Sequence, residues 1–316
     1  MRKILLLLAI LLTAYLAVAW YLSGLVLHTP DRSLATEYRM NADRWGLNLD
    51  SVRRTLPHQR EFAFPSPDGL TLRGWWYAPR PDSATCAIIF VHGYSTNRVN
   101  MIKYAPSVAH CGCELVFFDH RGHGESDEGY GGGGLREADD LLALHELVRK
   151  TTGLPDGRIG WFGESWGAAT ALQAAGAGRV DPAWVIAESP FADWYSAVME
   201  RGVKEYGAPL RMLAPAAFRF ASLRGGVDFY AASPVTAAAR IDVPVLLLHS
   251  LADTLTGPGQ SDLIAAAIRP DLLTYRPLDW GAWHAHNVAW RPEEFGEIVR
   301  EFLEGFCKTS PEDSAI

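Results

Sequence analysis

Residues 159–169 read Ile-Gly-Trp-Phe-Gly-Glu-Ser-Trp-Gly-Ala-Ala, which sets a Gly-x-Ser-x-Gly motif around Ser165. The residues before the motif, 159–162, are mostly apolar and typical of a strand, and Ala168 and Ala169 begin a run of small helix-forming residues. A strand, a sharp turn and a helix in this order are the setting of a nucleophile elbow, which raises a serine hydroxyl above a sheet. The motif alone is weak evidence, and its position between a strand and a helix strengthens it.

The backbone around this motif is expected to bind negative charge. The glycines that flank Ser165 are expected to avoid a collision of side chains across the turn, and the start of the following helix has unpaired N–H groups. The N–H of Trp166 is therefore a candidate oxyanion donor. A second candidate is the N–H of Tyr94, in the loop after the apolar strand at 87–91. The side chain of His92 is expected to be structural.

Apolar strands and helical segments alternate along most of the chain. Strands are predicted at 61–64, 70–77, 87–91, 115–118, 159–162, 184–187 and 243–248. Helices are predicted at 101–110, 135–150, 168–175 and 295–306. The pattern indicates an α/β fold with a mostly parallel central sheet flanked by helices. A helix-like aromatic segment at 194–233 interrupts the alternation and is expected to form a small helical cap.

A serine nucleophile requires a base and an acid that orients the base, expected in the order Ser, acid, His. Asp253 follows the strand at 243–248 and is the first candidate for the acid, with Asp193 in reserve. Two histidines, His284 and His286, lie in one loop just before the last predicted helix. We favour His284 as the base, and His286 is the alternative.

The composition excludes several other classes of protein. The chain has 316 residues with 29 basic and 36 acidic side chains, a net charge of −7, which argues against a nucleic-acid binder. The glycine-rich stretch at 129–134 lacks the Gly-Lys-Ser/Thr ending of a phosphate loop. The His-x-His pair lies in neither of the common zinc-protease motifs. We expect no metal and no cofactor.

The amino-terminal segment is long and apolar. Residues 4–27 contain no charged side chain, and as a helix they would be about 36 Å long, enough to cross a bilayer. Arg2 and Lys3 precede them and are expected to stay on the cytoplasmic side. We therefore expect a transmembrane anchor at 1–27 with the catalytic domain outside the cytoplasm. A signal peptide cleaved after Ala19 is the alternative, with secretion as its consequence.

The remaining boundaries follow from composition. Residues 28–60 are polar and are expected to form a tether, 61–306 the catalytic domain, and 307–316 a tail.

Four cysteines are too few for a disulfide scaffold and show no C-x-x-C spacing: Cys86, Cys111, Cys113 and Cys307. We expect buried, reduced thiols, with a Cys86–Cys113 bridge as the alternative.

Taken in order, these segments resemble the α/β-hydrolase superfamily. The matching pieces are His92-Gly93, the stretch Phe-Asp-His-Arg-Gly-His-Gly-Glu-Ser at 118–126, the elbow, the Asp253 loop and the terminal histidine loop. The resemblance covers about 61–306. Within the superfamily the chain is similar to membrane-anchored relatives of the serine aminopeptidase-like and dienelactone-hydrolase-like group. The resemblance implies an architectural role for Arg121.

The resemblance also bears on the choice of base. The spacing from His284 to Pro292 and Phe295 resembles the ending of that group, although this loop carries an additional Trp and His.

Residues and resemblance together predict a serine hydrolase that cleaves a carboxylic ester or thioester through an acyl-enzyme. The expected partner is a small acyl substrate that is partly apolar, because the predicted cap is rich in aromatic residues. A serine peptidase is the alternative within the enzyme class. A non-catalytic binding module on the same scaffold is the alternative outside it.

Overall fold

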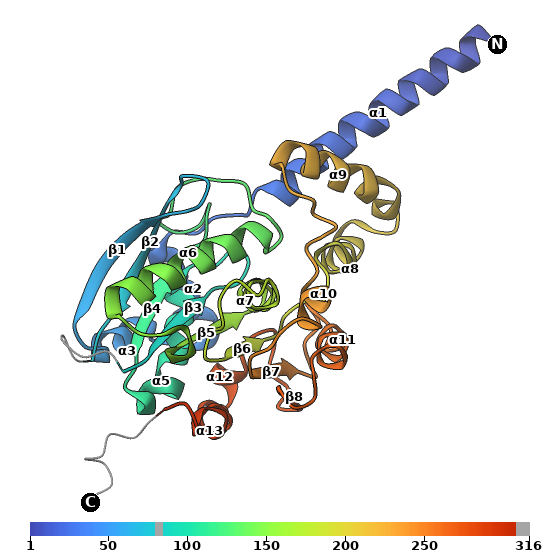
Figure 1. The fold of residues 1–316 in the computed structure, drawn as a ribbon. Helices are drawn as coiled ribbons and strands as arrows, with labels where there is room; N and C mark the ends of the chain where they lie inside the picture. The colour runs from blue at the N-terminus through green and yellow to red at the C-terminus, as the bar shows by residue number, and fades with distance from the viewer. Residues whose placement is uncertain (80–84, 308–316) are drawn as a thin grey trace, which may run out of the picture.

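The computed structural model describes residues 1–79 and 85–307, and these form one eight-stranded sheet in the order β1-β2-β4-β3-β5-β6-β7-β8. Figure 1 shows the sheet between two layers of helices. The strands are β1 Gln59–Pro65, β2 Thr71–Tyr77, β3 Ala87–Val91, β4 Glu114–Phe118, β5 Ile159–Glu164, β6 Val185–Glu188, β7 Val245–Ser250 and β8 Leu273–Leu278. The predicted α/β fold with a mostly parallel sheet is confirmed.

The strand directions place the elbow near the middle of the sheet. β1 and β2 pair antiparallel, and so do β2 and β4, whereas every pair from β4 to β8 is parallel. The parallel strands β3 and β5–β7 are buried along their whole length, because helices cover both faces of the sheet. The carboxyl ends of the parallel strands therefore share one edge, as ligand sites in such sheets require.

Helices fill the two layers and the cap. The helices of seven or more residues are α1 Arg2–Leu27, α2 Leu34–Trp45, α3 Leu49–Thr55, α6 Leu135–Thr152, α7 Trp166–Gly176, α8 Trp194–Tyr206, α9 Leu210–Gly225, α11 Gly259–Ala267 and α13 Pro292–Leu303. The shorter α-helices are α4 Arg98–Met101, α5 Ala105–Val108, α10 Pro234–Ala238 and α12 Asn287–Trp290. Three 3₁₀ turns lie at Ile102–Tyr104, Ala109–Cys111 and Asp156–Arg158.

The predicted cap is helical. α8 and α9 occupy most of the segment 194–233, and they pack against each other above the carboxyl edge of the sheet (Figure 1). The helix predicted at 101–110 is instead a series of short α and 3₁₀ turns. Pro106 lacks an N–H for a continuous helical ladder, which accounts for a break there.

The prediction of a tether at 28–60 was wrong. α2 and α3 lie in that segment and pack against the domain, with Leu49 buried in the same apolar cluster as β3 and α13. Both helices begin at side-chain caps, since Ser33 accepts from the N–H of Thr36 and Asn48 from that of Ser51. These capping residues were the sequence signal for helices.

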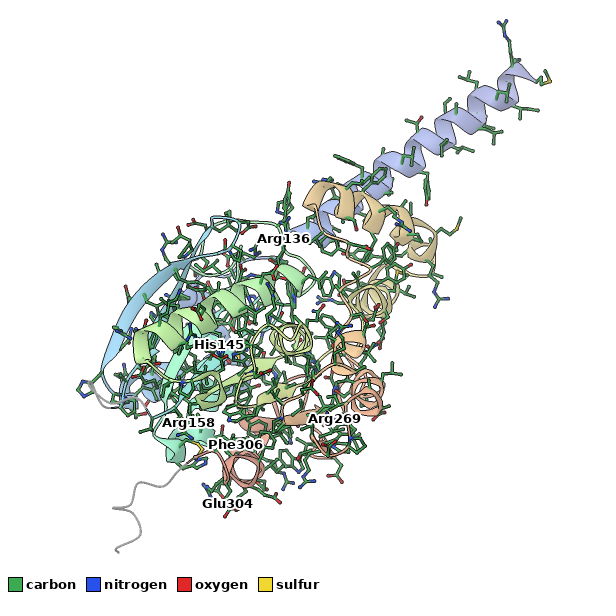
Figure 2. The ribbon with its side chains drawn as sticks, in the orientation of Figure 1. Arg136, His145, Arg158, Arg269, Glu304 and Phe306 are labelled. Atoms are coloured by element: carbon green, nitrogen blue, oxygen red, sulfur yellow. A yellow bond between two sulfur atoms is a disulfide. The ribbon has the colours of Figure 1, made fainter. Side chains whose placement is uncertain are left out.

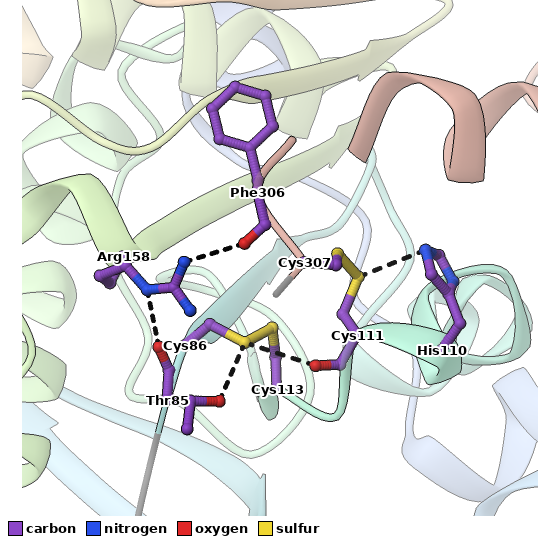
Figure 3. The surroundings of a disulfide bond; sticks show 8 residues. All are labelled: Thr85, Cys86, His110, Cys111, Cys113, Arg158, Phe306 and Cys307. Atoms are coloured by element: carbon purple, nitrogen blue, oxygen red, sulfur yellow. Dashed lines mark hydrogen bonds between the residues drawn. A yellow bond between two sulfur atoms is a disulfide. The ribbon is translucent and has the colours of Figure 1, made fainter. Parts of the chain in front are cut away.

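The prediction of reduced thiols was also wrong, because two disulfides join the four cysteines (Figure 3). Cys86 pairs with Cys113, as the alternative proposed, and links the starts of neighbouring strands β3 and β4. Cys111 pairs with Cys307, 196 residues away, and fastens the end of the last helical region to the domain. Cys307 therefore does not belong to a free tail, and 308–316 lie outside the described residues.

Candidate active site

The elbow around Ser165 has the geometry that its sequence predicts. β5 ends at Glu164 and α7 begins at Trp166, so Ser165 alone makes the turn. Its backbone has φ 52° and ψ −115°, a conformation that non-glycine residues rarely adopt. The strained backbone is that of Ser165, whose hydroxyl projects above the edge of the sheet in a nucleophile elbow.

The two flanking glycines permit the turn in different ways. A Cβ on Gly163 would lie 2.5 Å from the Cα of Ala168, which is the collision across the turn that we expected. A Cβ on Gly167 would instead lie 1.9 Å from the carbonyl oxygen of Val91, on the neighbouring strand β3. The second glycine is therefore required by the close approach of α7 to β3.

Three side chains from distant parts of the sequence meet at this turn. The Nε2 atom of His284 lies 2.7 Å from the Oγ of Ser165, and its Nδ1 atom lies 2.6 Å from an Oδ2 of Asp253. Both distances are those of hydrogen bonds. The arrangement requires the Nδ1–H tautomer, in which Nδ1 donates to the carboxylate and Nε2 is free to accept from the serine hydroxyl.

Asp253 lies just after β7 and is nearly inaccessible to solvent. Its Oδ1 accepts hydrogen bonds from the N–H groups of Leu255 and Thr256, both at 2.9 Å. Burial alone would raise the pKa of this carboxyl, but hydrogen bonds from His249 and His284 hold the pKa well below its usual range. Asp253 is therefore an ionised group placed to orient and stabilise an imidazolium.

The alternative base His286 and the alternative acid Asp193 lie in other surroundings. His286 is buried, with its ring 3.7 Å from that of Trp45 and its Nδ1 atom 2.5 Å from the carbonyl oxygen of His284. Burial and the charge of Lys103 lower its pKa to about 3. Asp193 caps α8, with Oδ1 accepting from the N–H of Ser196 at 2.9 Å. These contacts of His286 and Asp193 were not predicted from the sequence, although an aspartate at the start of a helix is a common N-cap.

The two candidate oxyanion donors flank Ser165. Within residues 1–79 and 85–307, the N–H groups of Tyr94 and Trp166 donate no hydrogen bond to another protein group, and Trp166 is the first residue of α7. A Cβ on Gly93, next to Tyr94, would lie 3.4 Å from the Cβ of Ser165, so this loop runs directly beside the nucleophile. The Tyr94 and Trp166 rings are 5.1 Å apart.

His92 and Arg121 have the structural contacts that we expected for them. His92 is fully buried, with Nε2 accepting from the N–H of His120 at 2.9 Å and Nδ1 lying 2.8 Å from the carbonyl oxygen of Gly93. Arg121 is paired with Asp68 and Asp140 at 2.7 Å each. These contacts fix the loops after β3 and β4 around the elbow.

A polar network behind the elbow was missed in the sequence. Lys103 is buried, and its Nζ lies 2.7 Å from an Oε2 of Glu164 and donates to the carbonyl oxygen of Ala285 at 3.1 Å. Asn100 donates to the same carboxylate at 2.8 Å. The signal was Glu164 itself, since a charged residue at the end of a buried strand requires a partner.

The same network holds the histidine loop. Ala285, between the two histidines, has φ 52°, a value that is costly for a residue with a Cβ. Asn287 donates through Nδ2 to Glu188 at 2.9 Å. Burial raises the pKa of Glu188, and the nearby charge of Lys103 opposes that shift. The loop carrying His284 is thus bonded on both sides to buried polar groups.

A separate aromatic cluster begins at Trp166, the residue after Ser165. Trp166 and Trp194 stack with ring centroids 5.3 Å apart, and Phe191 lies 5.3 Å from Trp194. This cluster extends through Phe218 of α9 to Leu27 at the end of α1. We call it the cap cluster, made of Leu27, Trp166, Ala169, Phe191, Trp194, Phe218, Ala221, Phe229 and Ala232.

Comparison with known proteins defines the class. The family model described as serine aminopeptidase, S33, matches residues 82–233, which include the elbow. Protein YqkD of Bacillus subtilis is 30% identical over 305 residues, which cover 96% of this chain and 98% of that protein.

Solved structures of low sequence identity share the fold. The Pyrococcus furiosus esterase Pf2001 superposes with a TM-score of 0.68 at 21% identity, covering 89% of this chain and 99% of the esterase. The Pyrococcus horikoshii acylaminoacyl peptidase gives 0.59 at 22% identity, covering 81% of this chain and 42% of the peptidase.

The sheet, the elbow and these likenesses define an α/β-hydrolase, and the chain is a serine hydrolase of that class. The chain belongs to one family with its full-length relative from B. subtilis, and its residues 82–233 match the serine aminopeptidase S33 model.

Proposed function

We propose that this hydrolase cleaves a carboxylic ester or thioester through an acyl-enzyme intermediate. The observation that carries the proposal is the continuous hydrogen-bond chain from Ser165 through His284 to Asp253, with distances of 2.7 and 2.6 Å. A binding module on this scaffold has no need of such a chain. Its completeness therefore favours an enzyme with Ser165 as nucleophile.

Each residue has one role in the proposed reaction. Ser165 Oγ attacks the carbonyl carbon while its proton passes to Nε2 of His284, and the ionised Asp253 stabilises the resulting imidazolium. The N–H groups of Tyr94 and Trp166 bind the oxyanion of the tetrahedral intermediate, and one such donor contributes about 3 kcal/mol to the barrier reduction. His284 then gives the proton to the leaving group, and water hydrolyses the acyl-enzyme by the reverse sequence.

The substrate proposal rests on the surroundings of Ser165. Trp166 follows the nucleophile in the chain, and its ring stacks on that of Trp194, so uncharged aromatic side chains gather close to the elbow. Apolar, aromatic walls favour an acyl group with hydrocarbon character. A serine peptidase is the second candidate, because the family description names an aminopeptidase and one structural neighbour is an acylaminoacyl peptidase.

We further propose that α1 anchors the enzyme with its catalytic domain outside the cytoplasm. α1 has 26 residues, and an 18-residue window in it has a mean hydropathy of 2.4. Two disulfides are consistent with an oxidising compartment. A signal peptide cleaved before Trp20 remains the alternative. Amino-terminal sequencing separates the two, and a carboxyl-terminal reporter that is active only outside the cytoplasm supports export.

The experiment that tests the chemistry compares the wild-type enzyme with Ser165→Ala. A fluorophosphonate probe should label the wild type and leave the variant unlabelled, because the probe reacts with an activated serine. Turnover of p-nitrophenyl esters against that of peptide p-nitroanilides then separates esterase from peptidase. Labelling of Ser165→Ala at the wild-type rate would refute the assignment of the nucleophile.

A further inference from the structure

The apolar amino-terminal helix is partly covered by the cap. α1 and α9 lie side by side where α1 reaches the domain (Figure 1). The hydroxyl of Tyr15 donates to the carbonyl oxygen of Met212 at 2.9 Å, and the rings of Trp20 and Phe220 are 5.5 Å apart. Residues further along α1 contact residues further along α9, so the two helices run in the same general direction. α9 therefore runs along the carboxyl-terminal half of α1.

The remaining part of α1 is too short to cross a bilayer alone. Residues 2–14 are all exposed, and Figure 2 shows their side chains standing free of the rest of the molecule. At about 1.5 Å per residue these 13 residues extend about 20 Å, whereas a hydrocarbon core is about 30 Å thick. A spanning α1 must therefore place part of 15–27 within the membrane, at the depth where α9 packs on it.

The outer face of α9 suits the surface of a membrane. Met212 is 74% exposed and Leu223 is 78% exposed. Arg211 and Arg219 are exposed on the same helix. Large apolar and basic side chains on one exposed helix are typical of segments that lie at the boundary between acyl chains and headgroups, with preference for anionic lipids.

The cap is also held firmly in this position. Arg224 donates to Ser23 Oγ at 2.5 Å and lies over the ring of Trp20, 4.6 Å from its centroid. At the other side, the guanidinium of Arg136, labelled in Figure 2, donates to the carbonyl oxygen of Gly225. The end of α9 is thus bonded both to α1 and to α6 of the hydrolase domain.

We propose that α9 is a membrane-docking helix whose exposed face lies in the outer surface of the same bilayer that α1 crosses. The occupant of this face is the lipid bilayer, with anionic headgroups opposite Arg211 and Arg219. This inference rests on the proposed anchoring by α1. In this position the outer face of α9 contacts lipid, while its inner face contributes the buried Phe218 to the cap cluster, which also contains Trp166, the residue after Ser165.

The test uses full-length protein in vesicles of phosphatidylcholine and phosphatidylglycerol. The photoreactive p-benzoylphenylalanine replaces Met212 or Leu223 in α9, Leu11 in the free part of α1, or Leu263 in α11, which is 58% exposed on the hydrolase domain. Position 11 reports on anchoring and position 263 on background. Lipid labelling at 212 and 223 should exceed that at 263 at least tenfold. Activity toward p-nitrophenyl acetate in detergent checks that each variant is folded.

Anchoring and docking fail in different ways. Labelling at 11 with only background at 212 and 223 leaves the anchor standing and overturns docking. Background at all four positions overturns both. Crosslinks from 212 to protein in place of lipid also overturn docking, since they identify a protein as the occupant. A double variant, Arg211→Gln with Arg219→Gln, should lower lipid labelling at 223 in the anionic vesicles and leave it unchanged in pure phosphatidylcholine. An equal effect in both lipids would refute the role of anionic headgroups.

Discussion

Two buried regions near Ser165 differ in polarity. Behind it, Lys103, Glu164 and Glu188 form a buried network of charges in which bonds run to the histidine loop. In the cap cluster, Trp166, which follows Ser165 in the chain, instead packs on Trp194 and other apolar side chains. Both regions are almost completely buried. Only the first has partners at fixed hydrogen-bond distances.

This difference separates two requirements of a serine hydrolase. Buried charges are tolerated only with complete and well-aligned partners, so the network behind Ser165 permits one arrangement of the loop that carries His284. Dispersion contacts are weak and without direction, so aromatic walls can adjust to substrates of different shape. The molecule therefore holds the loop that carries His284 by directed bonds from one side, whereas the contacts in the cap cluster are without direction.

The largest expected effect comes from removing the base itself. His284→Ala leaves Ser165 without a proton acceptor, and kcat toward p-nitrophenyl acetate should fall about 10⁴-fold. The matched control is His286→Ala, since His286 lies two residues away and is bonded to the backbone of the same loop. A greater loss in the control than in His284→Ala would transfer the role of base to His286.

The buried network should dominate stability. Lys103→Met leaves Glu164 without its ion partner, and loss of one partner of a buried pair costs about 3–5 kcal/mol of the free energy of unfolding. The control is Lys204→Met, because Lys204 forms an exposed pair with Glu200 on α8. Urea denaturation measures both.

A second variant tests whether the ion pair is the cause. Glu164→Gln added to Lys103→Met should restore part of the lost stability, because no uncompensated charge remains. If Lys103→Met alone unfolds at the same urea concentration as the wild type, the ion pair does not contribute to stability, and the proposed rigidity of the polar network is wrong.

His286 is neutral in the folded protein and should make the protein less stable in acid. The pKa of His286 is lowered to about 3, chiefly by burial and then by the charge of Lys103, whereas the unfolded chain has an ordinary histidine pKa near 6.5. The unfolded state therefore binds the additional proton as the pH falls from 6.5 toward 3. The stability is fully present above 6.5 and decreases by about 1.4 kcal/mol per pH unit below it.

Replacement of the histidine isolates this contribution. Between pH 7.5 and pH 5, His286→Gln should lose about 2 kcal/mol less than the wild type in urea titrations. Identical losses in both proteins would mean that other groups, such as the buried His92 and His120, account for the acid sensitivity.

The smallest effect is expected on the aromatic side. Trp194→Leu removes the stack on Trp166 and should raise KM for a long-chain p-nitrophenyl ester about tenfold, with little change for the acetate. Trp290→Leu on α12 is the control, since that indole is exposed. An equal rise of KM for both esters would show that Trp194 does not contact the acyl chain.

Local sequence predicted the elements with strong local signals. The strand before Ser165, the small-residue helix after it and the apolar strand at β3 were found within two residues of their observed bounds. The helices at 34–45 and 49–55 were not predicted, because their apolar residues are sparse and the caps at Ser33 and Asn48 are their main local signal. β8 was missed because it lies at the edge of the sheet, is only partly buried and contains Pro277.

The sequence by itself determined the α/β class, the elbow and the two loops in which an acid and a base had to be sought. These follow from periodicity and from residues adjacent along the chain. The tertiary structure decided which histidine faces Ser165, how the cysteines pair and how Lys103 reaches the histidine loop. His284 and His286 differ by two positions, and Lys103 and Ala285 by 182. Such choices depend on the approach of distant segments, which local patterns do not encode.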